Sequence, residues 1–163
     1  MDRPNPDIYG LLVAHMTALR GTCSRKRVGC VLVNEHREII ATGYNGPPRH
    51  RPHCTRYPCP GALLPRGQGL ATTSGLCQAV HAEANAVLQC RDIHQIDTLY
   101  VTTSPCLSCV NLLLNTSTRR IVFDVAHAHH DEAEELWRIM SREWVHIPLE
   151  NTVWSTLLST IPL

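Results

Sequence analysis

The chain has 163 residues, a formal net charge of +1 and 44% hydrophobic residues, which predicts one globular domain over residues 1–163 with a substantial core. The near-neutral charge argues against a nucleic-acid partner, because the one dense basic run is Arg25-Lys26-Arg27. No apolar run approaches the ~18 residues of a membrane span, and the polar, proline-broken start is unlike a signal peptide, so we expect a cytoplasmic protein without membrane contact.

Hydrophobic periodicity and turn signals predict alternating helices and strands. The pattern from Ile8 to Leu19 predicts a first helix over residues 7–20. The other expected elements are a hairpin of strands 28–33 and 38–44 around a turn at 34–37, helix 78–91, strand 97–102, helix 105–115, strand 120–124, helix 131–142 and strand 145–148. Repeated strand–helix crossovers indicate an α/β protein with a partly parallel sheet covered by helices on both faces.

The sequence also predicts a helix cap, an inward helix face and an apolar tail. Ser104-Pro105 is expected to be the N-cap and first residue of the helix to 115. Leu136, Ile139 and Met140 are expected to face inward from the helix at 131–142. After residue 150, Val153, Trp154, Leu157 and Leu158 recur at helical spacing, which suits docking on the domain or on a neighbour.

Residues 46–76 form a long segment that is rich in proline and glycine and has little apolar periodicity. A loop of this length inside a compact domain needs a reason to stay ordered. Cysteines in and around it suggest one, because in a reducing compartment clustered cysteines are typical of metal sites or free thiols rather than of disulfides.

Two short motifs carry the chemistry. His81-Ala82-Glu83 is followed by Pro105-Cys106-Leu107-Ser108-Cys109, and this combination is the signature of zinc-dependent nucleobase deaminases. His81 is near the start of one predicted helix, and Cys106 and Cys109 share a face of the first turn of another. Helix N-termini favour the thiolate that zinc needs. We therefore expect His81, Cys106 and Cys109 to bind a catalytic Zn²⁺, with an open fourth position.

Glu83 adds a carboxylate that the metal does not need. If its pKa is raised by a desolvated pocket, it can move a proton from the attacking water to a ring nitrogen and then to the leaving ammonia. The alternatives are a solvated glutamate at a helix start and two inert buried thiols. A purely structural zinc module is a further alternative, but it would have no use for Glu83.

Beyond these motifs, the chain resembles the cytidine and deoxycytidylate deaminase family, and within it the deoxycytidylate (dCMP) deaminases. The resemblance rests on the runs Val28–Val33, Ala41–Pro48, Val80–Ala86 and Leu99–Cys109. The Gly-Tyr-Asn-Gly-Pro run and the long insertion before His81 single out the dCMP branch. The resemblance implies a three-layer α/β/α fold with a mixed five-stranded sheet.

The same resemblance implies an activity and several site residues. The activity is hydrolysis of dCMP to dUMP, which supplies dTTP synthesis, in a homohexamer regulated by dCTP and dTTP. The residues expected to bind substrate are Asn45 at the sugar, Ala82 at the base, Ser24, Arg25 and Lys26 near the phosphate, and Ser104 and His127 in the pocket. The residues expected at the regulatory nucleotide are Gly43, Tyr44, Gly46 and Pro47.

A second zinc is expected from the remaining cysteines. Cys23 and Cys54 match positions where some dCMP deaminases hold a structural zinc, and Cys59 and Cys77 lie close in sequence; His53 is a reserve ligand. Four protein ligands form a closed site, and metal binding would supply folding energy to the insertion. The alternative is free loop thiols. Cys30 and Cys90 are expected to be small core residues, and the histidines at 127, 129 and 130 to lie on the surface.

Other substrates stay open at this point. Another free pyrimidine, such as dCTP or cytidine, is the main alternative to dCMP. A polynucleotide-editing deaminase would need a basic groove with stacking aromatics, and the near-neutral charge and 5% aromatic content disfavour it.

Overall fold

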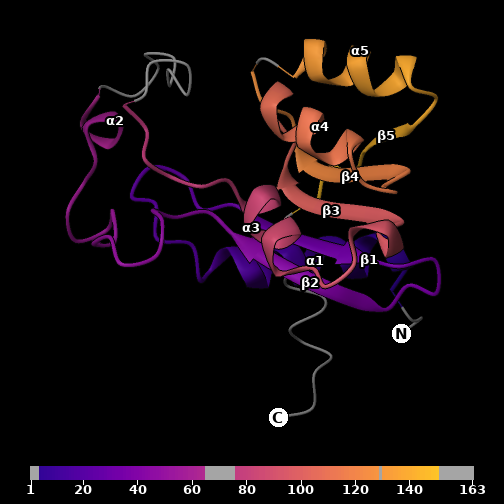
Figure 1. Ribbon diagram of the computed structural model, residues 1–163, viewed down its shortest axis with the longest axis horizontal. Helices are drawn as coiled ribbons and strands as arrows, with labels where there is room; N and C mark the ends of the chain where they lie inside the picture. The colour runs from indigo at the N-terminus through magenta and orange to yellow at the C-terminus, as the bar shows by residue number, and fades with distance from the viewer. Residues whose placement is uncertain (1–3, 65–75, 129, 151–163) are drawn as a thin grey trace.

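A mixed sheet forms the centre of the molecule. The computed structural model describes residues 4–64, 76–128 and 130–150, and its 5-stranded sheet has the order β2-β1-β3-β4-β5 (Figure 1). The strands are β1 Gly29–Val33, β2 Ile39–Tyr44, β3 Thr98–Thr103, β4 Arg120–Val125 and β5 Glu143–His146. β1 is antiparallel to both β2 and β3, whereas β3, β4 and β5 are parallel. This confirms the expected mixed sheet.

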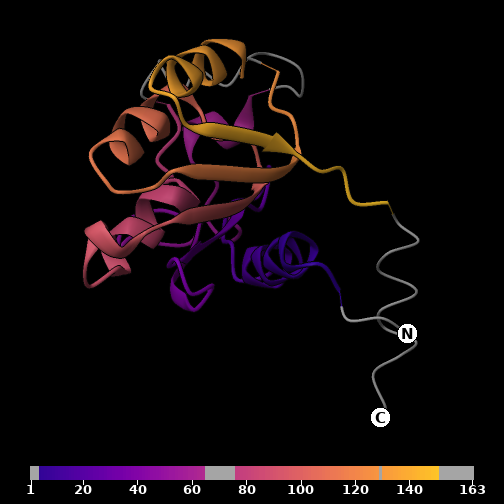
Figure 2. The same ribbon diagram turned by 90° about the vertical axis from the view of Figure 1, so that its right-hand side faces the viewer.

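Helices cover both faces of this sheet (Figure 2). On one face α1, Pro6–Ala18, packs Leu11 and Ala14 against β1, β3 and β4. On the other face lie α3 Ala82–Gln89, α4 Leu107–Leu114 and α5 Asp131–Ile139. The two parallel crossovers, through α4 and α5, therefore lie on the same side, as crossovers of one hand must when the strand order continues in one direction. The predicted three-layer α/β/α fold is confirmed.

Two glycines let helices approach the sheet closely. A Cβ on Gly29 would lie 2.0 Å from the carbonyl oxygen of Ala14 in α1. A Cβ on Gly43 would lie 2.2 Å from the carbonyl oxygen of Ala82 and 2.3 Å from the backbone nitrogen of Ala86 in α3. The absence of a side chain at Gly43 thus fixes how near α3, and the site at its start, comes to β2.

The helices that begin at the site start later than predicted. The helix expected over 78–91 begins at Ala82, because the residues before it are extended. Val80 pairs there with Gly46 through two backbone hydrogen bonds of 2.8 and 3.2 Å. The expected cap at Ser104-Pro105 was wrong, since α4 begins at Leu107 and Cys106 is its N-cap.

The expected inward face of α5 was also wrong in part. Ala133 and Trp137 occupy the inward positions, four residues apart, and Leu136 is only partly buried. Ile139 is 70% exposed, and Met140, 54% exposed, is already the C-cap. The neighbouring strand β5 lies at 143–146, two residues before the predicted 145–148.

Two short helical elements lie outside the layers of the sheet and its covering helices. The insertion contains a one-turn helix, α2 Pro60–Leu63, which sequence did not predict; Figure 1 shows it well away from the sheet. A 3₁₀ turn, η2 Ile93–Gln95, precedes β3.

Cys30 is buried as expected, whereas Cys90 ends α3 and is only half-buried. The apolar residues from Val153 to Leu158 lie outside the described residues. Over the described ranges no helix has the length and apolarity to cross a membrane.

Candidate metal centre and active site

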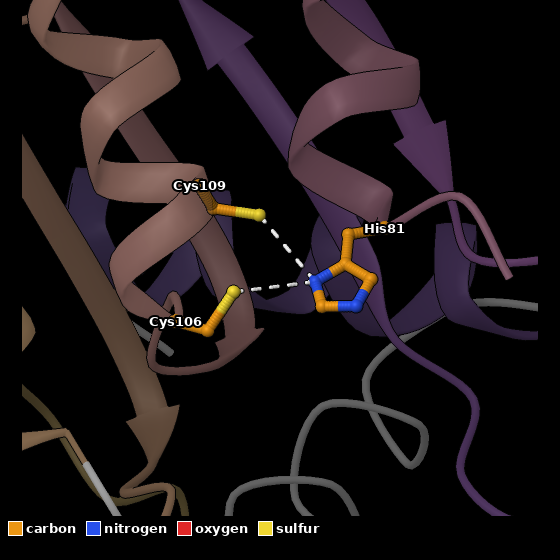
Figure 3. Close-up of side chains that lie close together, drawn as sticks. All are labelled: His81, Cys106 and Cys109. Carbon is orange, nitrogen blue, oxygen red and sulfur yellow. Dashed lines mark hydrogen bonds between the residues drawn. The ribbon is translucent and has the colours of Figure 1, made fainter. Parts of the chain in front are cut away.

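Three possible metal ligands from two helix starts meet beside the sheet. His81 is the N-cap of α3, Cys106 is the N-cap of α4, and Cys109 lies in the first turn of α4. The Sγ atoms of Cys106 and Cys109 lie 3.5 and 3.4 Å from Nδ1 of His81, and Figure 3 shows both sulfurs directed at this nitrogen. The possible ligand atoms of His81, Cys106 and Cys109 all lie within 4.8 Å of one another. Among the described residues, these three form the one such group.

These distances fit a zinc ion. Zinc bonds of about 2.0–2.1 Å to nitrogen and about 2.3 Å to sulfur, at tetrahedral angles, place the two kinds of atom roughly 3.5 Å apart. The two separations of 3.5 and 3.4 Å agree with this value. Three protein ligands of this type are the set found at catalytic rather than structural zinc sites.

The electrostatics of the cluster also favour a cation. The hydrogen bond from the Cys109 thiol, helped by His81, lowers the pKa of Cys106 well below its ordinary value, and the same bond raises the pKa of Cys109. The hydrogen bond with Cys106 raises the pKa of His81. The three ligands therefore share protons that a dication among them would displace.

Glu83 is buried next to these ligands. It occupies the first turn of α3, two residues after His81, and only 4% of it is exposed. Burial raises the pKa of its carboxyl, although the nearby His81 opposes this shift. Glu83 and His81 line one pocket with Cys106, so a carboxyl suited to proton transfer faces the same space as the metal ligands.

Several expected substrate residues line this pocket. They are Asn45, Ala82, Ser104 and His127. Asn45 is also a structural clamp, because its Oδ1 accepts from the backbone N–H of Val28 at 2.9 Å and its Nδ2 donates to the carbonyl of Lys26 at 2.8 Å. Ser104 is buried, and its hydroxyl accepts the backbone N–H of His127 at 2.7 Å.

The three residues expected near a phosphate differ in position. Lys26 is an exposed residue that lines the pocket, and desolvation by its surroundings lowers the pKa of its ammonium group. Arg25 also lines the pocket, but its guanidinium Nη1 donates to the carbonyls of Gly61 and Leu64. Ser24 does not line the pocket, and its hydroxyl lies 3.6 Å from Sγ of Cys54.

In the second cysteine set, Cys23, Cys54, Cys59 and Cys77, two of the four sulfurs lie close together. The Sγ atoms of Cys54 and Cys59 lie 3.7 Å apart, close to the roughly 3.8 Å edge between two sulfurs on one zinc. Burial opposes the thiolate of Cys54, but hydrogen bonds from the Cys59 backbone and from Ser24 lower its pKa overall. Cys23 and Cys77 line the pocket with Cys59, yet these four described cysteines do not bring three sulfurs within 4.8 Å of one another. His53 is exposed.

The segment expected to bind a regulatory nucleotide is hydrogen-bonded to α3. Gly43 and Gly46 are buried, while Tyr44 and Pro47 are half-buried. Asn85 of α3 donates to the carbonyl of Tyr44 at 2.7 Å. The segment is therefore attached directly to the helix that begins at His81.

Sequence analysis missed part of the pocket wall. Gly61 and Ala62 of α2, and Thr103 at the end of β3, line it with the predicted residues. The available signal was Cys59-Pro60, because proline is favoured at the first position of a helix.

Comparison with known proteins agrees with this geometry. The family model described as the cytidine and deoxycytidylate deaminase zinc-binding region matches residues 4–125. The chain belongs to the cytidine and deoxycytidylate deaminase family. Within this family, His81, Cys106 and Cys109 provide a ligand set that fits catalytic Zn²⁺.

Relatives in this family include deoxycytidylate deaminases. The one from Mycobacterium phage D29 is 41% identical over 127 residues, covering 76% of this chain and 97% of the relative. The one from Saccharomyces cerevisiae is 39% identical over 133 residues, covering 80% of this chain but 41% of the relative. This chain thus spans less than half of the yeast relative and nearly all of the phage relative.

A solved structure confirms the family fold. The dCMP deaminase from cyanophage S-TIM5, in complex with dCMP and dUMP, superposes with a TM-score of 0.69 at 20% sequence identity. The match covers 90% of this chain and 100% of that one. At this identity the comparison supports the architecture of the deaminase fold.

Proposed function

We propose that this protein hydrolyses dCMP to dUMP and ammonia. The observation that carries the proposal is the buried Glu83, with its raised pKa, in the same pocket as the His81, Cys106 and Cys109 cluster. The deoxycytidylate deaminases among its relatives support dCMP as the substrate. Deamination of dCTP or cytidine is the alternative within the same chemistry.

In the proposed reaction a C4–O bond forms and the C4–N bond to the amino group breaks. A zinc ion held by His81, Cys106 and Cys109 would supply Lewis acidity that makes a water nucleophilic at neutral pH. Glu83 accepts a proton from the attacking water and delivers it to N3 of the ring. It then takes the remaining proton from the new C4 hydroxyl and passes it to the departing amino group, so that C4 becomes a carbonyl and the products are dUMP and neutral ammonia.

The remaining pocket residues orient the nucleotide in this proposal. The Ala82 backbone would meet the base, while Ser104 and His127 form the wall beside it. Asn45 has one amide hydrogen and one oxygen lone pair left after its two backbone contacts, which leaves capacity for a sugar hydroxyl. Lys26, at the pocket and with its ammonium partly desolvated, supplies the charge for the phosphate. Ser24, which does not line the pocket, would have to turn away from Cys54 to reach the phosphate.

An ammonia-release assay tests the proposal. Purified, zinc-loaded protein would be given dCMP, dCTP, cytidine and single-stranded DNA, each with and without added dCTP or dTTP. We expect dCMP to have the highest kcat/KM. Release from another substrate with none from dCMP would contradict the substrate assignment but not the zinc chemistry, whereas no release from any of them would contradict both.

We also propose that Cys23, Cys54, Cys59 and Cys77 bind a second, structural zinc. The 3.7 Å separation of the Cys54 and Cys59 sulfurs supports this, and a bound ion would have to draw Cys23 and Cys77 inward, with His53 as a substitute ligand. Metal analysis of the purified protein should give about two zincs per chain and about one in Cys54→Ser. One zinc per chain in the wild type would contradict the second site.

Regulation and assembly complete the proposal. A regulatory dCTP or dTTP would bind at the segment containing Gly43, Tyr44, Gly46 and Pro47, and a homohexamer would form. Exposed Tyr9 and Met16 on α1, with Leu19 at its C-cap, support an association surface. Light scattering with and without dCTP tests the assembly, and a monomer under both conditions would contradict it.

A further inference from the structure

Arg25 has an unexpected partner. Its Nη1 donates to the carbonyl of Gly61 at 2.8 Å and to the carbonyl of Leu64 at 3.0 Å. Both acceptors belong to the short helix α2 and its C-cap, 36 and 39 residues away in sequence. The guanidinium therefore joins the loop that precedes β1 to the insertion.

The physical need for this contact follows from the shape of α2. The helix is 4 residues long, so its last carbonyls have no intrahelical partners. A cationic donor at a helix C-terminus satisfies these carbonyls and interacts favourably with their partial negative charge. Few other described contacts hold this part of the insertion, among them the bond from Gly61 N–H to the Leu76 carbonyl at 2.9 Å.

The position of α2 matters because it forms a wall of the pocket. Gly61 and Ala62 line the same pocket as His81 and Glu83. α2 packs closely against the backbone at Cys77, since a Cβ on Gly61 would lie 3.0 Å from the backbone nitrogen of Cys77. A displacement of α2 would therefore change the space in which the nucleotide binds.

We propose that Arg25 is a positioning residue that holds α2 as the wall of the substrate pocket and is not a phosphate ligand. The proposal rests on the proposed deaminase function of this pocket. It gives the neighbouring basic residues Arg25 and Lys26 different roles. Lys26 is left for the phosphate, and Arg25 acts through Gly61 and Ala62 on the binding of the whole nucleotide.

Product inhibition separates the two roles. dUMP and deoxyuridine differ only in the phosphate. Their inhibition constants against dCMP turnover would therefore be measured for Arg25→Met and Arg25→Lys. Arg27→Gln, at an exposed position, is the matched control. In Arg25→Met we expect both constants to rise by the same factor, about tenfold. Arg25→Lys should be intermediate because its ammonium can still donate to a carbonyl, and Arg27→Gln should match the wild type. A rise for dUMP alone would make Arg25 a phosphate ligand and overturn the proposal.

Limited proteolysis gives a readout that does not depend on turnover. Trypsin cleavage after the exposed Arg56, close to α2 in sequence, would be quantified by mass spectrometry in the zinc-loaded proteins. We expect cleavage to be about tenfold faster in Arg25→Met than in Arg27→Gln, because the segment opens more often. Equal cleavage rates would overturn the proposal. If the wild type does not deaminate dCMP, the function fails, while the cleavage rates still report whether Arg25 holds α2.

Discussion

At the scale of single residues, the position of Glu83 explains its proposed role. A carboxyl that is 4% exposed resists ionisation because burial raises its pKa. A carboxyl with a raised pKa accepts a proton more readily than a solvated glutamate, which suits a group that must take up a proton and release it again. His81, two residues earlier, opposes the shift and so favours the carboxylate form that the first proton transfer needs.

Glu83→Gln should abolish catalysis without emptying the metal site. We expect kcat to fall by about 10²–10⁴-fold, the typical contribution of a general acid–base, while zinc content stays unchanged because Glu83 is not a ligand. Ammonia release and metal analysis on the same preparation measure the two quantities. Glu135→Gln, at an exposed position of α5, is the control and should retain full activity. Substantial turnover by Glu83→Gln would remove Glu83 from the mechanism.

Lys26 carries a separate prediction. Lys26 is exposed but lines the pocket, where desolvation lowers the pKa of its ammonium, so it can meet a phosphate at the pocket. Lys26→Met should raise the KM for dCMP about tenfold and leave the inhibition constant of deoxyuridine within about twofold of wild type. Steady-state kinetics with both compounds measure this. A parallel rise for deoxyuridine would mean that Lys26 shapes the pocket instead of binding phosphate.

At the scale of elements, Gly43 sets the distance between β2 and α3. A methyl group there would lie 2.2 Å from the Ala82 carbonyl oxygen, so Gly43→Ala must push α3 away. We expect a loss of about 1–3 kcal/mol in the free energy of unfolding and weaker zinc binding, because His81 begins this helix. Urea denaturation and competition with a chelator measure the two effects. Leu88→Ala, at a 77% exposed position of the same helix, should change stability by less than about 0.5 kcal/mol.

The same close packing shows why the sequence predicted the position of a helix along the chain better than it predicted which of its residues face the sheet. Periodicity located α1 correctly, yet Met16 and Leu19 in the pattern are exposed. Besides Leu11, the helix presents the small residues Gly10, Ala14 and Ala18 to the sheet, because small residues permit the approach to Gly29. Hydrophobicity alone cannot distinguish an apolar stripe of large side chains from a stripe of small ones that packs more closely.

At the scale of the whole molecule, the metal ligands and several pocket residues were predictable, whereas the part of the pocket wall that α2 forms was not. His81, Cys106 and Cys109 belong to short motifs whose spacing carries the chemistry, and the structure brings them together as predicted. The role of Arg25 depends on α2, more than 30 residues away. A contact of that sequence separation, made to backbone carbonyls, leaves no pattern in one sequence.

The layers themselves are joined by a charged contact. Asp7 of α1 receives two hydrogen bonds from Arg120 of β4, at 2.6 and 2.8 Å, and a third from the Tyr100 hydroxyl at 3.0 Å. The hydrogen bonds from Arg120 lower the pKa of Asp7, against the opposing effect of burial. Because the folded pKa is lower than the unfolded one, this stabilisation is fully present above the ordinary aspartate pKa and is lost as the pH falls through the folded value.

Asp7→Asn should therefore destabilise the protein at neutral pH by about 1–3 kcal/mol, the range for losing hydrogen bonds to a charged group. The difference from wild type should stay nearly constant from about pH 7 down to about 4, the ordinary aspartate pKa, and should shrink as the pH falls further toward the lowered folded value. Urea denaturation of both proteins across this range measures it, and zinc-site protonation cancels because the two proteins share it. Glu132→Gln, at an exposed position, should follow the wild type throughout. A difference that stays constant with pH would show that the Asp7 charge does not join α1 to the sheet.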